Sequence, residues 1–269
     1  MAQNDLYNEE TISQAINTKW AGKTVHFAKE TDSTNIWSKA LAREGAVHGT
    51  LAVAEFQSAG RGRFDRRWTA PEGSAITMSI LLRPEFPPQY ASMLTLVMGL
   101  SVAQAIRENG FDPSIKWPND VVLSGKKICG ILTEMSVMED TIQHVVIGVG
   151  INVNTPEFQP EIADKATSLF LESGRIRDRC QIIGLVMKYF ENDYEKFIKT
   201  CDLTYLKEEY EELLANRLKP VRVLNGADSY EGLCRGINRN GELLVERQDG
   251  KIIGVGAGEV SVRGLYSYV

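Results

Sequence analysis

The longest apolar-rich stretch of this 269-residue chain covers residues 91–106, and it constrains the fold more than any other segment. Four small or polar residues interrupt it: Thr95, Gly99, Ser101 and Gln104. The stretch is therefore too short and too polar to span a bilayer, which takes about 20 predominantly apolar residues. It predicts a buried helix in a protein that has a substantial core.

Short β-branched runs lie on both sides of this helix and predict strands. The expected strands cover residues 23–29, 50–56, 75–83, 121–123, 128–135 and 144–153. Ser33 or Thr34 can cap a helix that follows the first strand. The apolar spacing from residue 178 to about 218 is helical throughout and forms two separate stripes, which predict two packed helices. The pattern predicts an α/β (α+β) domain in which helices flank a mixed β-sheet.

The composition changes after Lys219 and Pro220 to short strands separated by turn signals. Asn-Gly or Asp-Gly pairs, which favour tight hairpins, occur at residues 225–226, 240–241 and 249–250. We therefore expect a main domain over residues 1–218, in which residues 1–22 form a helical lead-in, and a small β-barrel-like domain over residues 219–269.

The charge, the cysteines and the first residues of the chain argue against several classes of protein. The 30 basic and 35 acidic residues give a net charge of −5, which argues against a nucleic-acid partner. The four cysteines form no Cys-x-x-Cys pair and so indicate neither a zinc site nor a disulfide framework. The first residues lack the basic and apolar regions of a secretion signal. We expect a cytoplasmic protein that binds no membrane.

A glycine- and arginine-rich segment, GRGRFDRRW, occupies residues 60–68 directly after a predicted strand. Its four arginines and one aspartate sum to +3 in a chain of net charge −5. Glycine lets a backbone approach a ligand closely, and arginine binds phosphate or carboxylate in a bidentate manner. The segment predicts a clamp for anions, although it has neither the Gly-Lys-Ser/Thr ending of a P-loop nor a Rossmann fingerprint.

A second candidate element is KWPND at residues 116–120, followed by KKICGILTE at residues 126–134. An amide beside a carboxylate can hold a base edge and a divalent metal ion. A lysine before an apolar strand can enter a ligand cavity, but a Lys-Lys pair is also common in ordinary exposed turns.

These elements occur in order with DSTN at residues 32–35 and GVGIN at residues 148–152. Together they resemble the biotin protein ligases, which activate biotin with ATP and attach it to a lysine of a carrier protein. The resemblance covers about residues 24–264 and includes GLCRGI at 232–237 and GEVSVR at 258–263. It implies a small C-terminal SH3-like β-barrel domain.

The resemblance also assigns residues to roles. It implies that Arg61, Arg63 and Lys127 are catalytic and that Asp120 is a candidate ligand of Mg²⁺. The implied biotin-binding residues are Ser33, Thr34, Asn35, Gln57, Arg61, Gly62, Arg63, Lys127, Gly130, Ile131, Gly148 and Gly150. The implied ATP- or adenylate-binding residues are Arg63, Arg66, Trp68, Asn119, Lys127 and Asn152. Residues 154–166 lie where the family has a second mobile loop.

The implied reaction has two steps and uses biotin and ATP as substrates with Mg²⁺. The biotin carboxylate attacks the α-phosphorus to form biotinyl-5′-AMP, and the lysine of a biotin carboxyl-carrier protein or domain, from acetyl-CoA or another acyl-CoA carboxylase, then displaces AMP. We expect a monomer or a weak homodimer. Asp65 departs from the family pattern, in which glycine is common, and we expect it to pair with Arg66 or Arg67.

Three other functions compete with this interpretation. A lipoate or octanoate ligase or transferase would share the fold, but the complete GRGR and KWPND motifs favour biotin. A biotin-responsive DNA-binding repressor would need a three-helix unit, and about 22 residues precede the first predicted strand. A non-catalytic biotin-binding module would have the same motifs without turnover.

Overall fold

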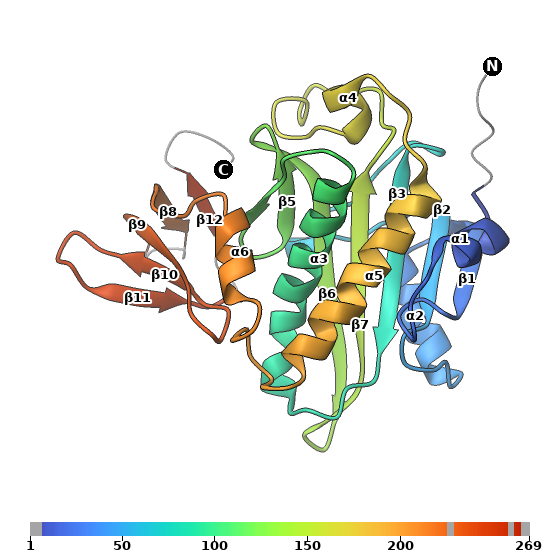
Figure 1. Cartoon of the computed structure of the whole chain (residues 1–269), viewed down its shortest axis with the longest axis horizontal. Coiled ribbons are helices and arrows are strands. Elements are labelled where there is room, and N and C mark those ends of the chain that lie inside the picture. The colour runs from blue at the N-terminus through green and yellow to red at the C-terminus, as the bar shows by residue number, and fades with distance from the viewer. Residues whose placement is uncertain (1–6, 225–228, 258–260, 265–269) are drawn as a thin grey trace.

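The computed structural model describes residues 7–224, 229–257 and 261–264, which form two β-sheets with helices (Figure 1). The larger sheet has seven strands in the order β1-β2-β3-β7-β6-β5-β4. Strands β1 and β2 are parallel, whereas the other neighbours in this sheet are antiparallel. This confirms the predicted mixed sheet. The strands are β1 Val25–Thr31, β2 Leu51–Gln57, β3 Ala75–Leu82, β4 Ser114–Lys116, β5 Asp120–Leu123, β6 Lys126–Met138 and β7 Thr141–Asn152.

Helices cover the sheet, and α3 and α5 cross one of its faces side by side (Figure 1). The α-helices are α1 Glu9–Ala15, α2 Thr34–Arg43, α3 Leu94–Glu108, α4 Leu169–Ser173, α5 Arg179–Phe197 and α6 Lys207–Leu213, with short 3₁₀ helices η1 Arg63–Asp65 and η2 Pro88–Met93. Helix α1 lies within the predicted helical lead-in.

The two helices expected over residues 178–218 are present as α5 and α6, and the chain leaves the helical conformation between them. Cys201 has a positive φ of 53°. The Asp202 carboxylate accepts hydrogen bonds from the Thr200 hydroxyl and the Thr204 backbone N–H, at 2.7 and 2.9 Å. Such side-chain to backbone bonds offer the chain an alternative to the helix.

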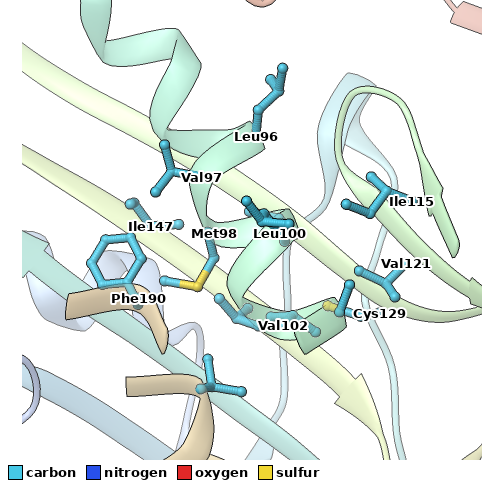
Figure 2. Packing of buried hydrophobic residues seen from close by; sticks show 14 of the residues in the cluster. Leu96, Val97, Met98, Leu100, Val102, Ile115, Val121, Cys129, Ile147 and Phe190 are labelled. Carbon is cyan, nitrogen blue, oxygen red and sulfur yellow. The ribbon is translucent and has the colours of Figure 1, made fainter. Parts of the chain in front are cut away.

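Helix α3 is the centre of the core, as the apolar stretch predicts, although it begins three residues later than expected. Figure 2 shows Val97, Met98 and Leu100 packed among side chains of the sheet and of α5. The segment Pro88–Glu108 is long and apolar enough to span a membrane, but 72% of its most apolar part is buried inside the protein. This burial is typical of a core helix.

The smaller sheet is antiparallel and has five strands in the order β11-β10-β9-β8-β12. They are β8 Pro220–Leu224, β9 Tyr230–Ile237, β10 Leu243–Glu246, β11 Ile252–Val255 and β12 Ser261–Gly264. The turn signals at 240–241 and 249–250 lie between paired strands, as predicted. The signal at 225–226 lies outside the described residues.

Two buried contacts join the smaller sheet to the main body. The Trp117 indole N–H donates to the Gly241 carbonyl at 3.0 Å, and the Ile237 backbone N–H donates to the Glu211 carboxylate at 3.0 Å. The first contact places the smaller sheet directly beside residues 116–120, which contain the cis Trp117–Pro118 peptide and Asn119.

Candidate active site

One cavity gathers the motifs that are far apart in the sequence. Its wall combines the N-terminus of α2, the end of β2, the Gly-Arg segment, the start of β6 and the middle of β7. The lining residues are Ser33, Thr34, Asn35, Gln57, Arg61, Gly62, Arg63, Trp68, Asn119, Lys127, Gly130, Ile131, Leu132, Gly148, Val149 and Gly150. All twelve residues expected at biotin are among them.

Five of the six residues expected at the nucleotide line a neighbouring cavity, which shares Arg63 with the first. This cavity of about 140 Å³ is lined by Arg66, Trp68, Asn119, Asp120 and Lys127, among others. Asn152 lines neither cavity. This residue is buried and its side-chain amide donates to the Thr167 carbonyl at 3.2 Å, so it supports the wall rather than facing the cavity.

Uncharged polar groups form one end of the first cavity. The Gln57 Oε1 accepts from the Thr34 backbone N–H and hydroxyl, at 2.7 and 3.1 Å. The Ser79 hydroxyl, fully buried in β3, lies 2.7 Å from both Thr34 Oγ1 and Asn35 Oδ1. The sequence analysis missed Ser79, although a serine inside the apolar run of β3 is a signal for it. This end suits a neutral ligand group that can donate and accept hydrogen bonds.

Glu134 is a second residue that the sequence analysis left without a role. Its Oε2 accepts from Asn35 Nδ2 at 2.8 Å, and its Oε1 lies 2.6 Å from Lys39 Nζ and 3.4 Å from Arg61 Nη1. Burial alone would raise the pKa of Glu134, but these hydrogen bonds and positive charges lower it below its usual value. Glu134 is therefore ionised at neutral pH and links the polar end to the arginine segment.

The cationic groups converge between the two cavities. Lys127 Nζ donates to Asp120 Oδ1 at 2.7 Å and lies 5.9 Å from the centroid of the Trp68 ring. Arg63 donates to Asn119 Oδ1 at 3.0 Å and to the Ala257 carbonyl of the C-terminal part at 2.6 Å. Burial lowers the pKa of Arg63, but an arginine stays charged in proteins. The position suits an anion that bridges both cavities.

Two glycines of β7 allow the close approach of side chains at the wall. A Cβ atom on Gly148 would lie 2.1 Å from Asn35 Oδ1, and one on Gly150 would lie 2.3 Å from Trp68 Cε2. Both distances are far shorter than van der Waals contact. The GVGIN motif is thus required for this packing, in which Trp68 of the Gly-Arg segment lies directly on the sheet.

Residues 154–166 lie against Lys127 through the backbone. The Lys127 N–H donates to the Lys165 carbonyl at 2.8 Å, and the Lys127 carbonyl accepts from the Thr167 N–H at 2.9 Å. The expected second loop is therefore next to the site. The expected pairing of Asp65 with Arg66 or Arg67 lies outside the described side chains.

The carboxylates decide whether a metal ion fits this site. Within residues 7–224, 229–257 and 261–264, no three His, Cys, Asp or Glu residues form a group that could hold one. Asp120 supplies one partly buried carboxylate beside Asn119. Mg²⁺ commonly uses one or two carboxylates together with substrate phosphates, so Asp120 fits a metal that arrives with a nucleotide.

Comparison with known proteins places these features in a family. The model of the biotin/lipoate A/B protein ligase family matches residues 27–152, and that of the biotin protein ligase C terminal domain matches residues 219–263. The bifunctional ligase/repressor BirA of Bacillus subtilis is 38% identical over 90% of this chain and 75% of its own length. The biotin–[acetyl-CoA-carboxylase] ligase of Mycobacterium tuberculosis is 34% identical over 86% of each chain.

Solved structures agree with the sequence matches. A biotin protein ligase from Aquifex aeolicus, determined in complex with biotin and ATP, has a TM-score of 0.78 and 33% identity over 90% of this chain and 99% of its own.

Proposed function

Since this chain belongs to the biotin/lipoate A/B protein ligase family, we propose that the cavity residues described above carry out its chemistry. The chain is a biotin protein ligase: it activates biotin with ATP and transfers it to a protein lysine. The observation that supports the residue assignments is that one cavity unites all twelve expected biotin residues, which include Lys127 and part of the Gly-Arg segment.

The biotin ring occupies the uncharged end in this proposal. Ser33, Thr34, Asn35 and Gln57 provide hydroxyl and amide groups that suit a neutral urea. Ser79 and Glu134 hold Thr34 and Asn35 in position through the hydrogen bonds given above. The apolar tail lies along Gly130 and Ile131, and its carboxylate then points toward Lys127 and Arg63.

The cations overcome the repulsion between two anions. The biotin carboxylate must approach the α-phosphate of ATP, and the two negative charges oppose this approach. Lys127, Arg61 and Arg63 are held near that point before the reaction, so they stabilise the charge that develops at phosphorus without reorganising. The carboxylate oxygen bonds to the α-phosphorus as pyrophosphate leaves, and no enzyme nucleophile is needed.

The nucleotide lies in the second cavity in this proposal, with its base at Asn119 and with Arg66 and Trp68 beside it. The Nε1 of Trp68 is buried and has no hydrogen-bond partner among the described residues, so it offers a donor to the adenylate. Mg²⁺ bound with the phosphates near Asp120 would supply charge neutralisation there. In the second step, the lysine amine attacks the acyl carbon, a proton leaves the amine, and AMP departs.

The Gly-Arg segment becomes ordered when the two anions bind. Fixing each residue costs about 1–2 kcal/mol, and the bound carboxylate and phosphates offset that cost. Protease cleavage between Arg61 and Arg67 should slow when biotin and ATP are added. Equal cleavage with and without the ligands would refute the ordering.

The carrier and the cellular setting complete the proposal. The lysine substrate belongs to the biotin carboxyl-carrier domain of an acetyl-CoA or other acyl-CoA carboxylase, which agrees with the names of relatives. All four cysteines are free thiols, which suits the cytoplasm. We further propose a monomer or weak homodimer that binds neither nucleic acid nor membrane, with the domains divided at residues 218 and 219.

Pyrophosphate exchange distinguishes this proposal from its alternatives. Biotin should stimulate the exchange of labelled pyrophosphate into ATP, whereas lipoate and octanoate should not. Exchange with lipoate or octanoate alone would assign the chain to the other branch of the family, and biotin binding without exchange would indicate a binding module. Tight, salt-sensitive retention of a biotin-operon DNA fragment would show a repressor function.

A further inference from the structure

The Gly-Arg segment starts where two strands of the large sheet separate. Strands β2 and β3 pair from Leu51–Ile80 to Ala54–Thr77, and their ladder ends there. Strand β2 continues alongside β1, and β3 continues alongside β7. The residues between them, 58–74, include the whole Gly-Arg segment.

The carboxylate of Glu55 makes a hydrogen bond across the gap where the two strands separate. Its Oε1 accepts the backbone N–H of Gly73 at 2.8 Å. Glu55 is in the strand that leads into the segment, and Gly73 lies just before the strand that leaves it. One side chain therefore joins the strand that precedes residues 58–74 to Gly73, near the end of this connection.

Arg179, the first residue of α5, holds this carboxylate in place. Its Nη1 and Nη2 donate to the two oxygens of Glu55 at 2.6 and 3.2 Å, and Nη1 also donates to the Ala75 carbonyl at 3.2 Å. The Arg179 side chain is 2% exposed, and the Tyr7 ring lies 3.7 Å from its guanidinium carbon. A bidentate pair of this kind fixes direction as well as distance.

The tip of the segment is a separate small unit. The Trp68 N–H donates to the Gly60 carbonyl at 3.0 Å, and the Gly62 N–H donates to the Arg66 carbonyl at 2.7 Å. These bonds close the tip on itself. Arg61 and Arg63 hold the tip at the cavity through Glu134 and Asn119, and the two connections of the tip to the sheet, which Glu55 joins, also limit its position.

We propose that Glu55 and Arg179 are positioning residues that hold the Gly-Arg segment in register with the biotin and nucleotide cavities. This inference rests on the proposed function for its effect on catalysis, but not for its effect on the segment itself. Glu55 and Arg179 do not line the cavities, so they act through the segment.

The test compares Glu55→Ala with Glu191→Ala. Glu191 is a matched control because its carboxylate also binds backbone N–H groups, those of Lys19, Trp20 and Ala21, in a part of the protein remote from the segment. Three quantities are measured for each: the melting temperature, the rate of trypsin cleavage between Arg61 and Arg67 without ligands, and the kinetics of biotin-dependent pyrophosphate exchange.

We expect Glu55→Ala to be cleaved about tenfold faster and to raise KM for biotin about tenfold, from the loss of hydrogen bonds to a charged group, with kcat within threefold of wild type. Glu191→Ala should lower the melting temperature without either change. Glu55→Gln retains an oxygen for the Gly73 N–H and should shift both quantities in the same direction if the alanine variant does not fold.

Wild-type cleavage and KM in a folded Glu55 variant would overturn the inference, as would equal changes in Glu191→Ala. Cleavage of the unliganded protein tests the inference even if biotin and ATP prove not to be its substrates.

Discussion

Replacing Gly150 by alanine should impair catalysis without unfolding the protein. The new Cβ would lie 2.3, 2.5 and 2.7 Å from three atoms of the Trp68 ring, whereas ordinary carbon contacts are about 3.5–4.0 Å. Gly150 pairs with both β3 and β6, at Thr77 and Gly130. Its backbone cannot give way, so Trp68 and the Gly-Arg segment must move outward by about 1 Å or more.

The strain of such overpacking is about 1–3 kcal/mol, and here it opposes the closed segment. It predicts a loss of about 5- to 150-fold in kcat/KM for biotin, measured by pyrophosphate exchange. Gly99→Ala is the matched control, because its Cβ would meet Ile131 and Ile115 at 3.7 and 3.9 Å, which are ordinary contacts. That helix interior should gain up to about 1 kcal/mol of stability. A kcat/KM for Gly150→Ala within about twofold of wild type would refute this reasoning.

Three more predictions concern the lysine, the contact between the sheets and a buried acid. Lys127→Ala should reduce adenylation about a hundredfold or more. Lys126→Ala, whose Nζ donates to the Ala163 carbonyl at the surface, should retain wild-type exchange, and equal rates for both variants would remove Lys127 from the site. Trp117→Phe leaves the Gly241 carbonyl without its buried donor and should cost about 1–3 kcal/mol in urea unfolding. Trp37, a half-buried tryptophan of α2, is the control, and a stability of Trp117→Phe equal to that of Trp37→Phe would contradict this. Burial raises the pKa of Asp193 from 3.8 to about 6, because it disfavours ionisation of the carboxyl in the folded state. The free energy of unfolding of the wild type should therefore fall as pH rises from about 4 to 6, whereas Asp193→Asn should avoid this loss and be more stable at pH 7 by up to about 3 kcal/mol. A difference between the two proteins that does not change with pH would refute this.

The sequence predicted most strands because buried strands are rich in β-branched residues, which are visible as short runs. Strand β2 begins and ends within one residue of the expected 50–56, and the expected 144–153 overlaps most of β7. The three-residue β4 was missed, since so short a strand has no period to detect. The two helices between residues 178 and 218 were expected, but the position of the break between them was not, because it depends on local bonds of Asp202.

The sequence predicted that the motif residues share one site, but it did not predict the residues that hold them in position. Glu134 reaches Asn35 from 99 residues away, and Glu55 reaches Arg179 from 124 residues away. A carboxylate in a strand looks like any exposed acid in the sequence, and only the folded chain shows which backbone or side-chain donors it meets. Ser79 carried a local signal, because it is a polar residue in a strand that is buried throughout.

A crystal structure of the chain after incubation with biotin, ATP and Mg²⁺ tests the central claim most directly. The proposal predicts biotinyl-5′-AMP across both cavities, with its ureido ring at Thr34 and Gln57, its phosphate within hydrogen-bond distance of Lys127 and Arg63, and its adenine beside Asn119. An adenylate bound with its ring at Asn119, or outside the two cavities, would contradict it.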